Sequence, residues 1–132
     1  PMQMVDTITD ISNTHVVTEF EVKSTCIFVE EGKFAEVGLI ENMAQTCSAI
    51  VGQFLFGIED TSNYVIGYIS AIKKLELFAL PKVQEVVRTE AELLSRFDTD
   101  EYYICSMRCN AFVGDILMAT AEMNLVIKNL TE

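Results

Sequence analysis

The stretch from Gly38 to Gly57 constrains the fold more than any other part of the sequence. Its apolar residues recur every three or four positions and form two adjoining stripes, which is the spacing of an α-helix. A helix that is apolar around most of its circumference must be covered by other parts of the chain. The pattern therefore predicts a long central helix from about Gly38 to Phe56. Its stripes are Leu39, Met43, Cys47, Ile50 and Phe54, and Ile40, Ala44, Val51 and Leu55.

Polar residues distinguish this helix from a membrane-spanning one. A membrane span needs about 20 predominantly apolar residues. The stretch instead contains six polar or charged side chains, so it is typical of a buried helix in a soluble protein. These residues are Glu41, Asn42, Gln45, Thr46, Ser48 and Gln53.

Glu41 is the one charged residue between Gly38 and Ile58. A buried carboxylate costs free energy unless it is paired, hydrogen-bonded or protonated. One explanation is that Glu41 lies in the first turn, where the helix dipole favours a negative side chain. The other is that Glu41 and Gln45, one turn apart on the same face, form the polar floor of a pocket. The spacing leaves both explanations open.

Alternating apolar and polar residues predict strands on both sides of this helix, and the Tyr, Val and Ile content of Tyr64–Phe78 predicts a further one. Short turns join the strands that follow the helix, including a hairpin turn at Val113–Asp115, so we expect an antiparallel sheet. The helix is expected to end at Gly57, before an exposed loop at Glu59–Asn63. Another turn is expected at Glu30–Gly32. The predicted strands are Val16–Ile27, Tyr64–Phe78, Glu85–Phe97, Glu101–Phe112 and Ile116–Lys128.

These elements indicate an α+β architecture in which a curved antiparallel sheet wraps one long helix. At 132 residues, half of them hydrophobic, the chain is expected to form a single domain over residues 1–132. The N-terminal segment, to about Thr14, is polar and could cover a sheet edge. An unpaired edge strand is often closed by a second copy, so a homodimer or higher oligomer is expected.

The charge and the cysteines exclude several classes of function. A net charge of −11 with only nine Lys and Arg residues argues against nucleic acid and against an acidic membrane surface. The four cysteines lack zinc-ligand spacing, and His15 is the only histidine, so neither a metal nor a cofactor is expected. No targeting or lipidation signal is visible, and we expect a cytoplasmic protein with reduced cysteines.

Three segments resemble the hot-dog fold, and within it the β-hydroxyacyl-acyl carrier protein dehydratases of fatty acid synthesis. Leu39–Gln45 reads Leu-Ile-Glu-Asn-Met-Ala-Gln and is similar to the Glu-x-Met-Ala-Gln helix of that family. Phe112–Glu122 resembles its last hairpin, and Pro81 followed by a strand from Glu85 resembles the segment after its third strand. The resemblance covers roughly Phe20 to Ile127.

The resemblance implies particular site residues. In that family a helix Glu and a His in a Gly-His-Phe-Pro loop face each other across a dimer interface and transfer protons as water is lost. Glu41 matches the Glu and Gln45 matches the Gln of the helix motif. Aligning Gly32-Lys33-Phe34 with Gly-His-Phe places Lys33 where the family has its His. Glu41 is therefore the main catalytic candidate, with Gln45 beside it and Lys33 as a further candidate.

The sequence leaves three classes of function open. The first is a dehydratase-like protein that binds β-hydroxyacyl or enoyl thioesters of acyl carrier protein or coenzyme A, in fatty-acid or related acyl-chain metabolism. Such a protein could have an altered site, could be a heterodimer subunit whose partner supplies the His, or could bind without catalysis. The second class is an acyl thioesterase that uses Glu41 as base or nucleophile. The third is a structural or assembly protein.

Overall fold

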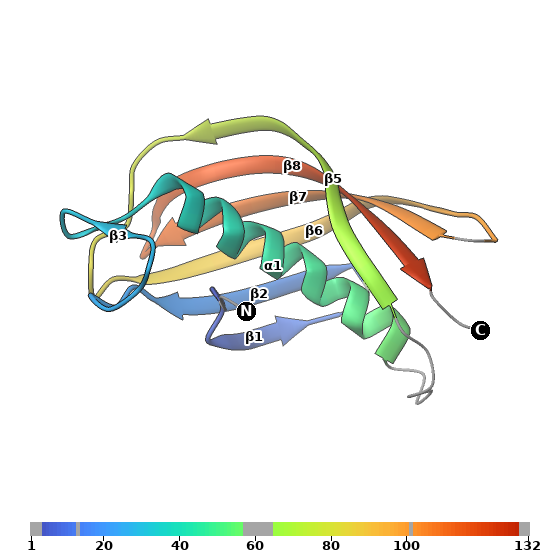
Figure 1. Ribbon diagram of the computed structural model, residues 1–132, viewed down its shortest axis with the longest axis horizontal. Coiled ribbons are helices and arrows are strands. Elements are labelled where there is room, and N and C mark those ends of the chain that lie inside the picture. Colours follow the sequence, from blue (N-terminus) through green and yellow to red (C-terminus); the bar gives the residue numbers. More distant parts are fainter. Residues whose placement is uncertain (1–3, 13, 57–64, 101, 130–132) are drawn as a thin grey trace.

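One long helix crosses the concave side of a curved sheet (Figure 1). The computed structural model describes residues 4–12, 14–56, 65–100 and 102–129. Helix α1, Glu36–Phe56, has 21 residues and confirms the predicted central helix. The expected end at Gly57 and the loop at Glu59–Asn63 lie outside the described residues. Among those that are described, no helix is long and apolar enough to cross a membrane.

The main sheet has six strands in the order β1-β2-β6-β7-β8-β5, and neighbouring strands pair antiparallel. This arrangement confirms the predicted α+β hot-dog architecture. Because β5 lies next to β8 rather than next to β6, the chain crosses from one edge of the sheet to its middle after β5. The strands are β1 Thr7–Ile11, β2 His15–Glu21, β5 Val65–Leu77, β6 Val86–Asp98, β7 Tyr102–Val113 and β8 Ile116–Asn129.

The first predicted strand, Val16–Ile27, is shorter in the structure than expected. Strand β2 ends at Glu21 instead of reaching Ile27, because the chain turns where the Cys26 N–H donates a 2.9 Å hydrogen bond to the Lys23 carbonyl. The polar N-terminal segment covers the sheet edge, as anticipated, by forming β1 beside β2.

A small hairpin leads the chain into α1. Strands β3, Val29–Glu30, and β4, Lys33–Phe34, pair with each other. The two residues between them, Glu31 and Gly32, have φ of 52° and 78°, as in the tight turns that favour glycine. This confirms the predicted turn at Glu30–Gly32. Gly114, with φ of 60°, occupies the predicted hairpin turn between β7 and β8.

Gly38 fixes how closely this hairpin meets the helix. A Cβ atom at position 38 would lie 2.6 Å from the Cβ of Phe28 and would also overlap the ring of Phe34. Phe34 is fully buried and stacks near Phe20, with ring centroids 5.4 Å apart. Only glycine therefore lets the first turns of α1 seat against the hairpin.

The core lies between α1 and the face of the sheet that it covers. Buried residues alternate along each strand, as the period of two predicts. Small Ala and Cys side chains on β7 and β8 leave room for the larger residues of the helix. Buried core residues include Leu39, Met43 and Cys47 of α1, Val87 and Ala91 of β6, Cys105, Met107, Cys109 and Ala111 of β7, and Ala119, Ala121, Met123 and Leu125 of β8.

Strand β5 forms one edge of the sheet. It pairs with β8, and its other edge pairs with no strand in the described part of the chain. Its register shifts between Ile69 and Ala71 and again between Lys73 and Glu76, where Lys74 has φ of 53°. Ile72 and the nearby Phe78 are 41% and 56% exposed. The edge is thus bent, and apolar side chains on and beside it are open to solvent.

Candidate functional site

Glu41 and Gln45 lie on the outer side of α1, one turn apart. Gln45 Nε2 donates a 3.2 Å hydrogen bond to Glu41 Oε1, so the two side chains share one face as their spacing predicted. The first-turn explanation for Glu41 is wrong because α1 begins at Glu36, which occupies the first turn and leaves Glu41 in the second. Glu41 is exposed, so its carboxylate keeps its contact with water. That the pair forms the floor of a pocket stays a prediction.

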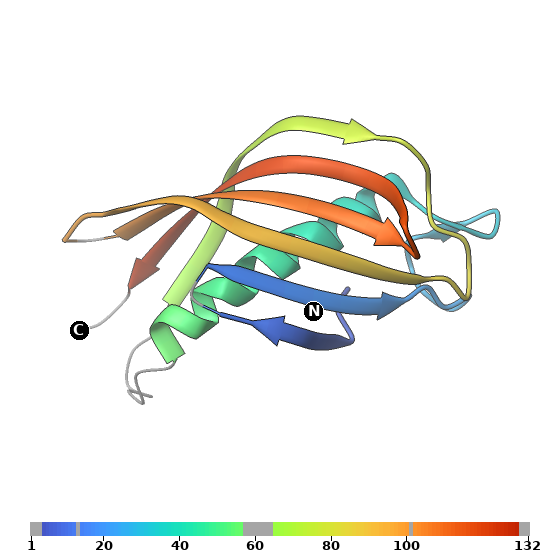
Figure 2. The same cartoon turned by 180° about the vertical axis from the view of Figure 1, so that it is seen from behind.

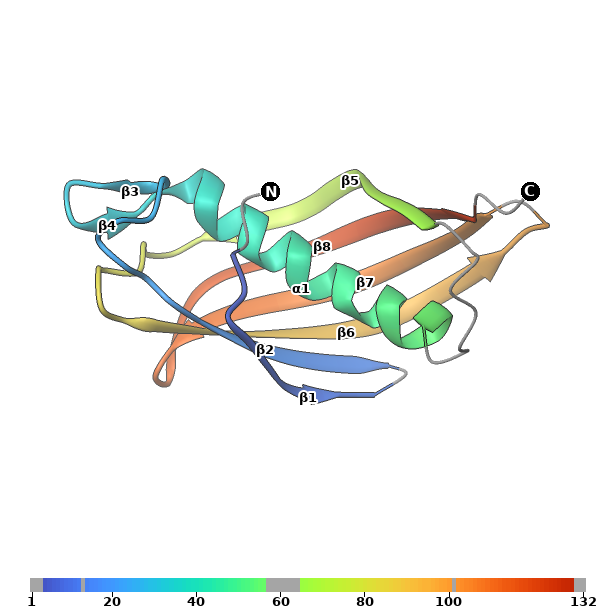
Figure 3. The same ribbon diagram turned by 60° about the horizontal axis from the view of Figure 1, so that its bottom comes forward.

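The chain segment before β1 packs against this face of the helix (Figure 3). The backbone N–H of Met4 donates a 2.7 Å hydrogen bond to Gln45 Oε1. The Met4 carbonyl accepts a 2.6 Å hydrogen bond from Asn42 Nδ2. Met4 is only 4% exposed and its side chain joins the core. Two helix amides therefore hold a single residue by both its backbone N–H and its carbonyl.

Asn42 also belongs to a buried polar network that links the helix to the sheet. Its Oδ1 accepts a 2.6 Å hydrogen bond from the hydroxyl of Thr89 in β6. One turn later, Thr46 Oγ1 donates to the Asn42 carbonyl at 2.9 Å and lies 2.7 Å from Thr18 Oγ1 of β2. All four side chains are fully buried. Each polar group has a partner, which a buried position requires.

Sequence reasoning missed the role of this network. It counted Asn42 and Thr46 only as polar residues that exclude a membrane span. Their separation by four positions was a usable signal, since it places both on one side of the helix. Periodicity alone does not show that this side faces the threonines of β2 and β6.

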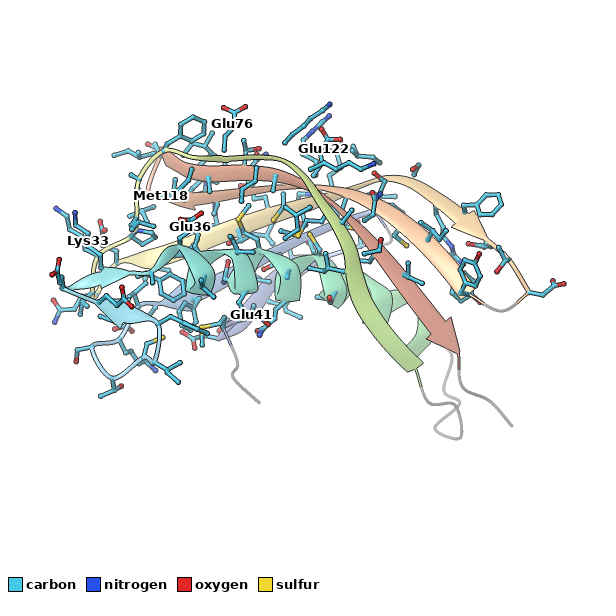
Figure 4. The ribbon with its side chains drawn as sticks, turned by 45° about the horizontal axis from the view of Figure 1, so that its top comes forward. Lys33, Glu36, Glu41, Glu76, Met118 and Glu122 are labelled. Atoms are coloured by element: carbon cyan, nitrogen blue, oxygen red, sulfur yellow. The ribbon has the colours of Figure 1, made fainter. Side chains whose placement is uncertain are left out.

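Lys33 lies apart from Glu41. It is an exposed residue of β4 and lines a cavity of about 690 Å³ at the start of α1. Figure 4 shows Lys33 at the hairpin end of the molecule and Glu41 further along the helix. A Lys acts as a base when it is desolvated, and Lys33 remains in contact with water. The cavity residues are Glu30, Glu31, Lys33, Ala35, Glu36 and Leu80, and do not include Glu41.

The only histidine of the sequence, His15, is the first residue of β2. Figure 2 shows the sheet from the side opposite to the view of Figure 1. In β2 the residues Val16, Thr18 and Phe20 are buried beneath the helix, so His15 points away from α1. His15 pairs in register with Glu92 and lines a small cavity with Glu90, Glu92 and Arg108. The side chains of His15 and Glu41 therefore cannot come into contact within one chain.

No group of three or more His, Cys, Asp or Glu residues able to hold a metal ion occurs in the part of the chain that the structure describes. The chemistry available beside Glu41 is that of a carboxylate and two amides. A carboxylate can accept or return a proton, and amides can orient it or bind polar groups of a ligand.

Comparison with known families identifies the chain. A family model described as ApeP dehydratase matches residues 1–131. The chain belongs to the ApeP-like family. This finding confirms the dehydratase-like resemblance inferred from the helix motif. A search of curated proteins found no match.

Solved structures support the same fold. The dehydratase heterocomplex ApeI:P from Xenorhabdus doucetiae is similar with a TM-score of 0.81 and 16% identity, covering 94% of this chain and 82% of that one. A hypothetical thioesterase with coenzyme A from Streptococcus pneumoniae has a TM-score of 0.68 and 14% identity, covering 96% and 90%. A thioesterase from Haemophilus influenzae has a TM-score of 0.70 and 13% identity, covering 95% and 79%. At these identities the likeness establishes the hot-dog fold.

Proposed function

We propose that this chain is one subunit of a dehydratase that removes water from β-hydroxyacyl thioesters, and that a second hot-dog subunit supplies the missing proton-transfer group. The observation that carries the proposal is the separation of Glu41 from the only histidine of the sequence: Glu41 is exposed on the outer side of α1, and His15 points from the opposite face of the sheet. Membership of the ApeP-like family supports the reaction class.

The reaction needs two proton transfers. A base removes the proton from the α-carbon, its electron pair forms the α–β double bond, and the β-carbon–oxygen bond breaks while an acid protonates the departing hydroxyl to water. Glu41 can take one of these roles. The hydrogen bond from Gln45 Nε2 holds its carboxylate in place while leaving it accessible. The second role falls to a His of the partner subunit.

The free edge of β5 is the surface proposed for that partner. No strand in the described part of the chain pairs with its outer edge, and Ile72, Leu77 and Phe78 expose apolar area on or just after the strand. An edge of this kind favours pairing with a strand from another chain. The ApeI:P structure is itself a heterocomplex, which supports a different chain rather than a second copy as the partner.

The substrate is proposed to be carried by acyl carrier protein or coenzyme A, in fatty-acid or related acyl-chain metabolism. Both carriers are anionic, and this chain is negatively charged as well, with a net charge of −11. Like charges disfavour docking. We therefore assign the main contact with the carrier to the partner subunit, while this chain contributes Glu41 to the reacting end of the substrate.

The test compares the isolated chain with the reconstituted pair. This chain is purified alone and together with a hot-dog subunit that has the Gly-His-Phe motif, and enoyl product is measured from a β-hydroxyacyl thioester. We expect turnover from the pair and little from this chain alone, since one general acid–base partner typically contributes ~10² to 10⁴ in rate. Robust enoyl formation by the isolated chain would refute the proposal of a shared site.

Thioester hydrolysis is the second candidate function. It is favoured by one observation, that Glu41 is an exposed carboxylate without a histidine on its own face, because hydrolysis can proceed from a single carboxylate acting as base or nucleophile. Release of free thiol from acyl-coenzyme A by the isolated chain, with no enoyl product from the pair, would select hydrolysis over dehydration.

A further inference from the structure

We propose that Met4 is a positioning residue for Glu41 and acts through the side-chain amide of Gln45. This role rests on the proposed function, in which the Glu41 carboxylate exchanges a proton with the substrate. It gives the chain segment before β1 a part in the reaction: the backbone N–H of Met4 sets the orientation of the Gln45 amide, and the oriented amide holds the carboxylate.

The Gln45 amide lies between one group that can only donate a hydrogen bond and one that can only accept. The Met4 N–H donates to Gln45 Oε1 at 2.7 Å, and Glu41 Oε1 accepts from Gln45 Nε2 at 3.2 Å. A backbone N–H has no acceptor atom, and an ionised carboxylate has no proton to donate. Turning the amide over would bring two donors together on one side and two acceptors together on the other. Met4 therefore determines which end of the amide faces Glu41.

Met4 is itself held firmly, so its N–H is a fixed reference for the amide. Its carbonyl accepts a 2.6 Å hydrogen bond from Asn42 Nδ2, and its side chain is 4% exposed and belongs to the core. Asn42 in turn accepts a 2.6 Å hydrogen bond from the hydroxyl of Thr89 in β6. Two residues after Met4, the Asp6 N–H donates to the Glu19 carbonyl of β2 at 3.0 Å. The N-terminal segment is thus anchored to both the helix and the sheet.

Glu41 needs this support because its side chain is exposed. An exposed glutamate has many accessible rotamers, and ordering them costs free energy. The bond from Gln45 is made to Oε1, so Oε2 is the oxygen assigned to the substrate proton. Holding a reacting group in place contributes strongly to rate, and a displacement of about 1 Å can lower the rate by ~10². Met4 should therefore affect kcat more than KM.

Met4→Pro and Met4→Ala are matched variants for testing the N–H. Both remove most of the buried side chain and keep the carbonyl that accepts from Asn42, but only proline lacks the backbone N–H. In the reconstituted pair we expect kcat for Met4→Pro to be about tenfold below that for Met4→Ala, with similar KM. This loss is smaller than the ~10² to 10⁴ expected when a proton-transfer group is removed, because Glu41 is still present. Equal kcat values for the two variants would contradict the proposal.

Gln45→Ala separates the loss of the N–H from a general effect of proline on the backbone. Without the Gln45 amide the Met4 N–H has nothing to orient, so Met4→Pro and Met4→Ala should have equal kcat in the Gln45→Ala background. A difference that persists there would assign the effect to the backbone and overturn the positioning role. Met118→Ala, in β8, is the stability control. Met118 is 7% exposed, so its truncation should lower the free energy of unfolding while leaving kcat unchanged.

NMR relaxation of Gln45 Nε2 gives a measurement on the unaltered chain that needs no turnover. If Met4 and Glu41 hold the amide from both sides, its order parameter should approach the ~0.85 of rigid backbone instead of lying below the ~0.6 of flexible groups. Met4→Pro should lower this order parameter, and Met4→Ala should preserve it. A flexible Gln45 amide in the unaltered chain would overturn the positioning role.

The enoyl assay and the NMR measurement together distinguish this role from the proposed function. If the unaltered pair forms enoyl product and Met4→Pro matches Met4→Ala in kcat, the positioning role is wrong and the proposed function stands. If Gln45 loses order only in Met4→Pro while the unaltered pair forms no enoyl product, the orientation of Gln45 by Met4 stands and dehydration is wrong.

Discussion

The hydroxyl of Thr89 in β6 donates a 2.6 Å hydrogen bond to Oδ1 of Asn42 in α1, and both side chains are fully buried. The same Asn42 amide holds the Met4 carbonyl through Nδ2. One side chain thus joins the sheet, the helix and the N-terminal segment. Because Asn42 directly follows Glu41, this anchor also fixes the rotation of the helix that presents the carboxylate.

Asn42 and Thr89 should stabilise the fold as a coupled pair, so that their substitutions do not lower the free energy of unfolding additively. Asn42→Leu leaves the Thr89 hydroxyl and the Met4 carbonyl without this partner, and Thr89→Val leaves Asn42 Oδ1 without its donor. Each unsatisfied buried group costs about 1–3 kcal/mol in the free energy of unfolding. The double variant should lose less than the sum of the two single losses, as urea unfolding would measure. Strict additivity would show that the two residues act independently.

Replacing Glu41 should affect chemistry and not folding. We expect Glu41→Gln to reduce enoyl formation by the reconstituted pair by about 10² to 10⁴. Because Glu41 is exposed, the free energy of unfolding should change by no more than about 0.5 kcal/mol. Glu36→Gln is the matched control, being another exposed glutamate of α1, and should retain activity. Equal turnover in the two variants would remove Glu41 from the proposed mechanism.

A charge on β5 should disrupt association with the partner subunit. Ile72, in β5, is 41% exposed, and Ile8, in the opposite edge strand β1, is 47% exposed. Ile72→Asp would place a carboxylate in the proposed interface, whereas Ile8→Asp would place one outside it. Light scattering of the mixed subunits should show loss of the complex for Ile72→Asp alone. The interface would have to lie elsewhere if Ile8→Asp had the larger effect.

Stability should fall in alkaline solution because of the buried cysteines. Hydrogen bonding with Cys47 and complete burial raise the pKa of the Cys109 thiol, so the folded state keeps it protonated. An unfolded thiol ionises near pH 8.5, so its stabilising contribution is full below about that pH and is lost as pH rises toward the folded pKa. Burial also raises the pKa of Cys105.

Urea unfolding at about pH 7 and pH 10 would measure this loss. Cys109→Ala should weaken the dependence on pH, although it also lowers stability at pH 7 by leaving a small cavity. Cys26→Ala is the control, because Cys26 is only half-buried and lies outside the helix–sheet core. A decline between the two pH values that is unchanged in Cys109→Ala would assign it to other groups.

Much of the fold could be predicted from residues that are close in sequence. The period of the apolar stripes located α1 to within two residues at its start. The period of two placed β6 to β8, and the Tyr, Val and Ile content placed β5, with nearly correct bounds. The spacing of Glu41 and Gln45 put their side chains on one face, and their hydrogen bond bears this out. Such patterns follow from the backbone geometry of a single helix or strand, so they can be recognised without knowing how the elements pack.

Contacts between distant residues were decided by the tertiary structure. Asn42 meets Thr89 across 47 positions and Met4 across 38, because β6 lies beneath α1 and the N-terminal segment packs against the outer side of the helix. The order of the strands also placed His15 on the face away from Glu41, and β5 at an open edge. Alternation shows that a strand has two faces, but only packing determines which of them the helix covers. The sequence by itself thus determined the elements and the helix motif of this protein, whereas their packing decided the buried network, the position of Met4 against the helix and which strands form the edges of the sheet.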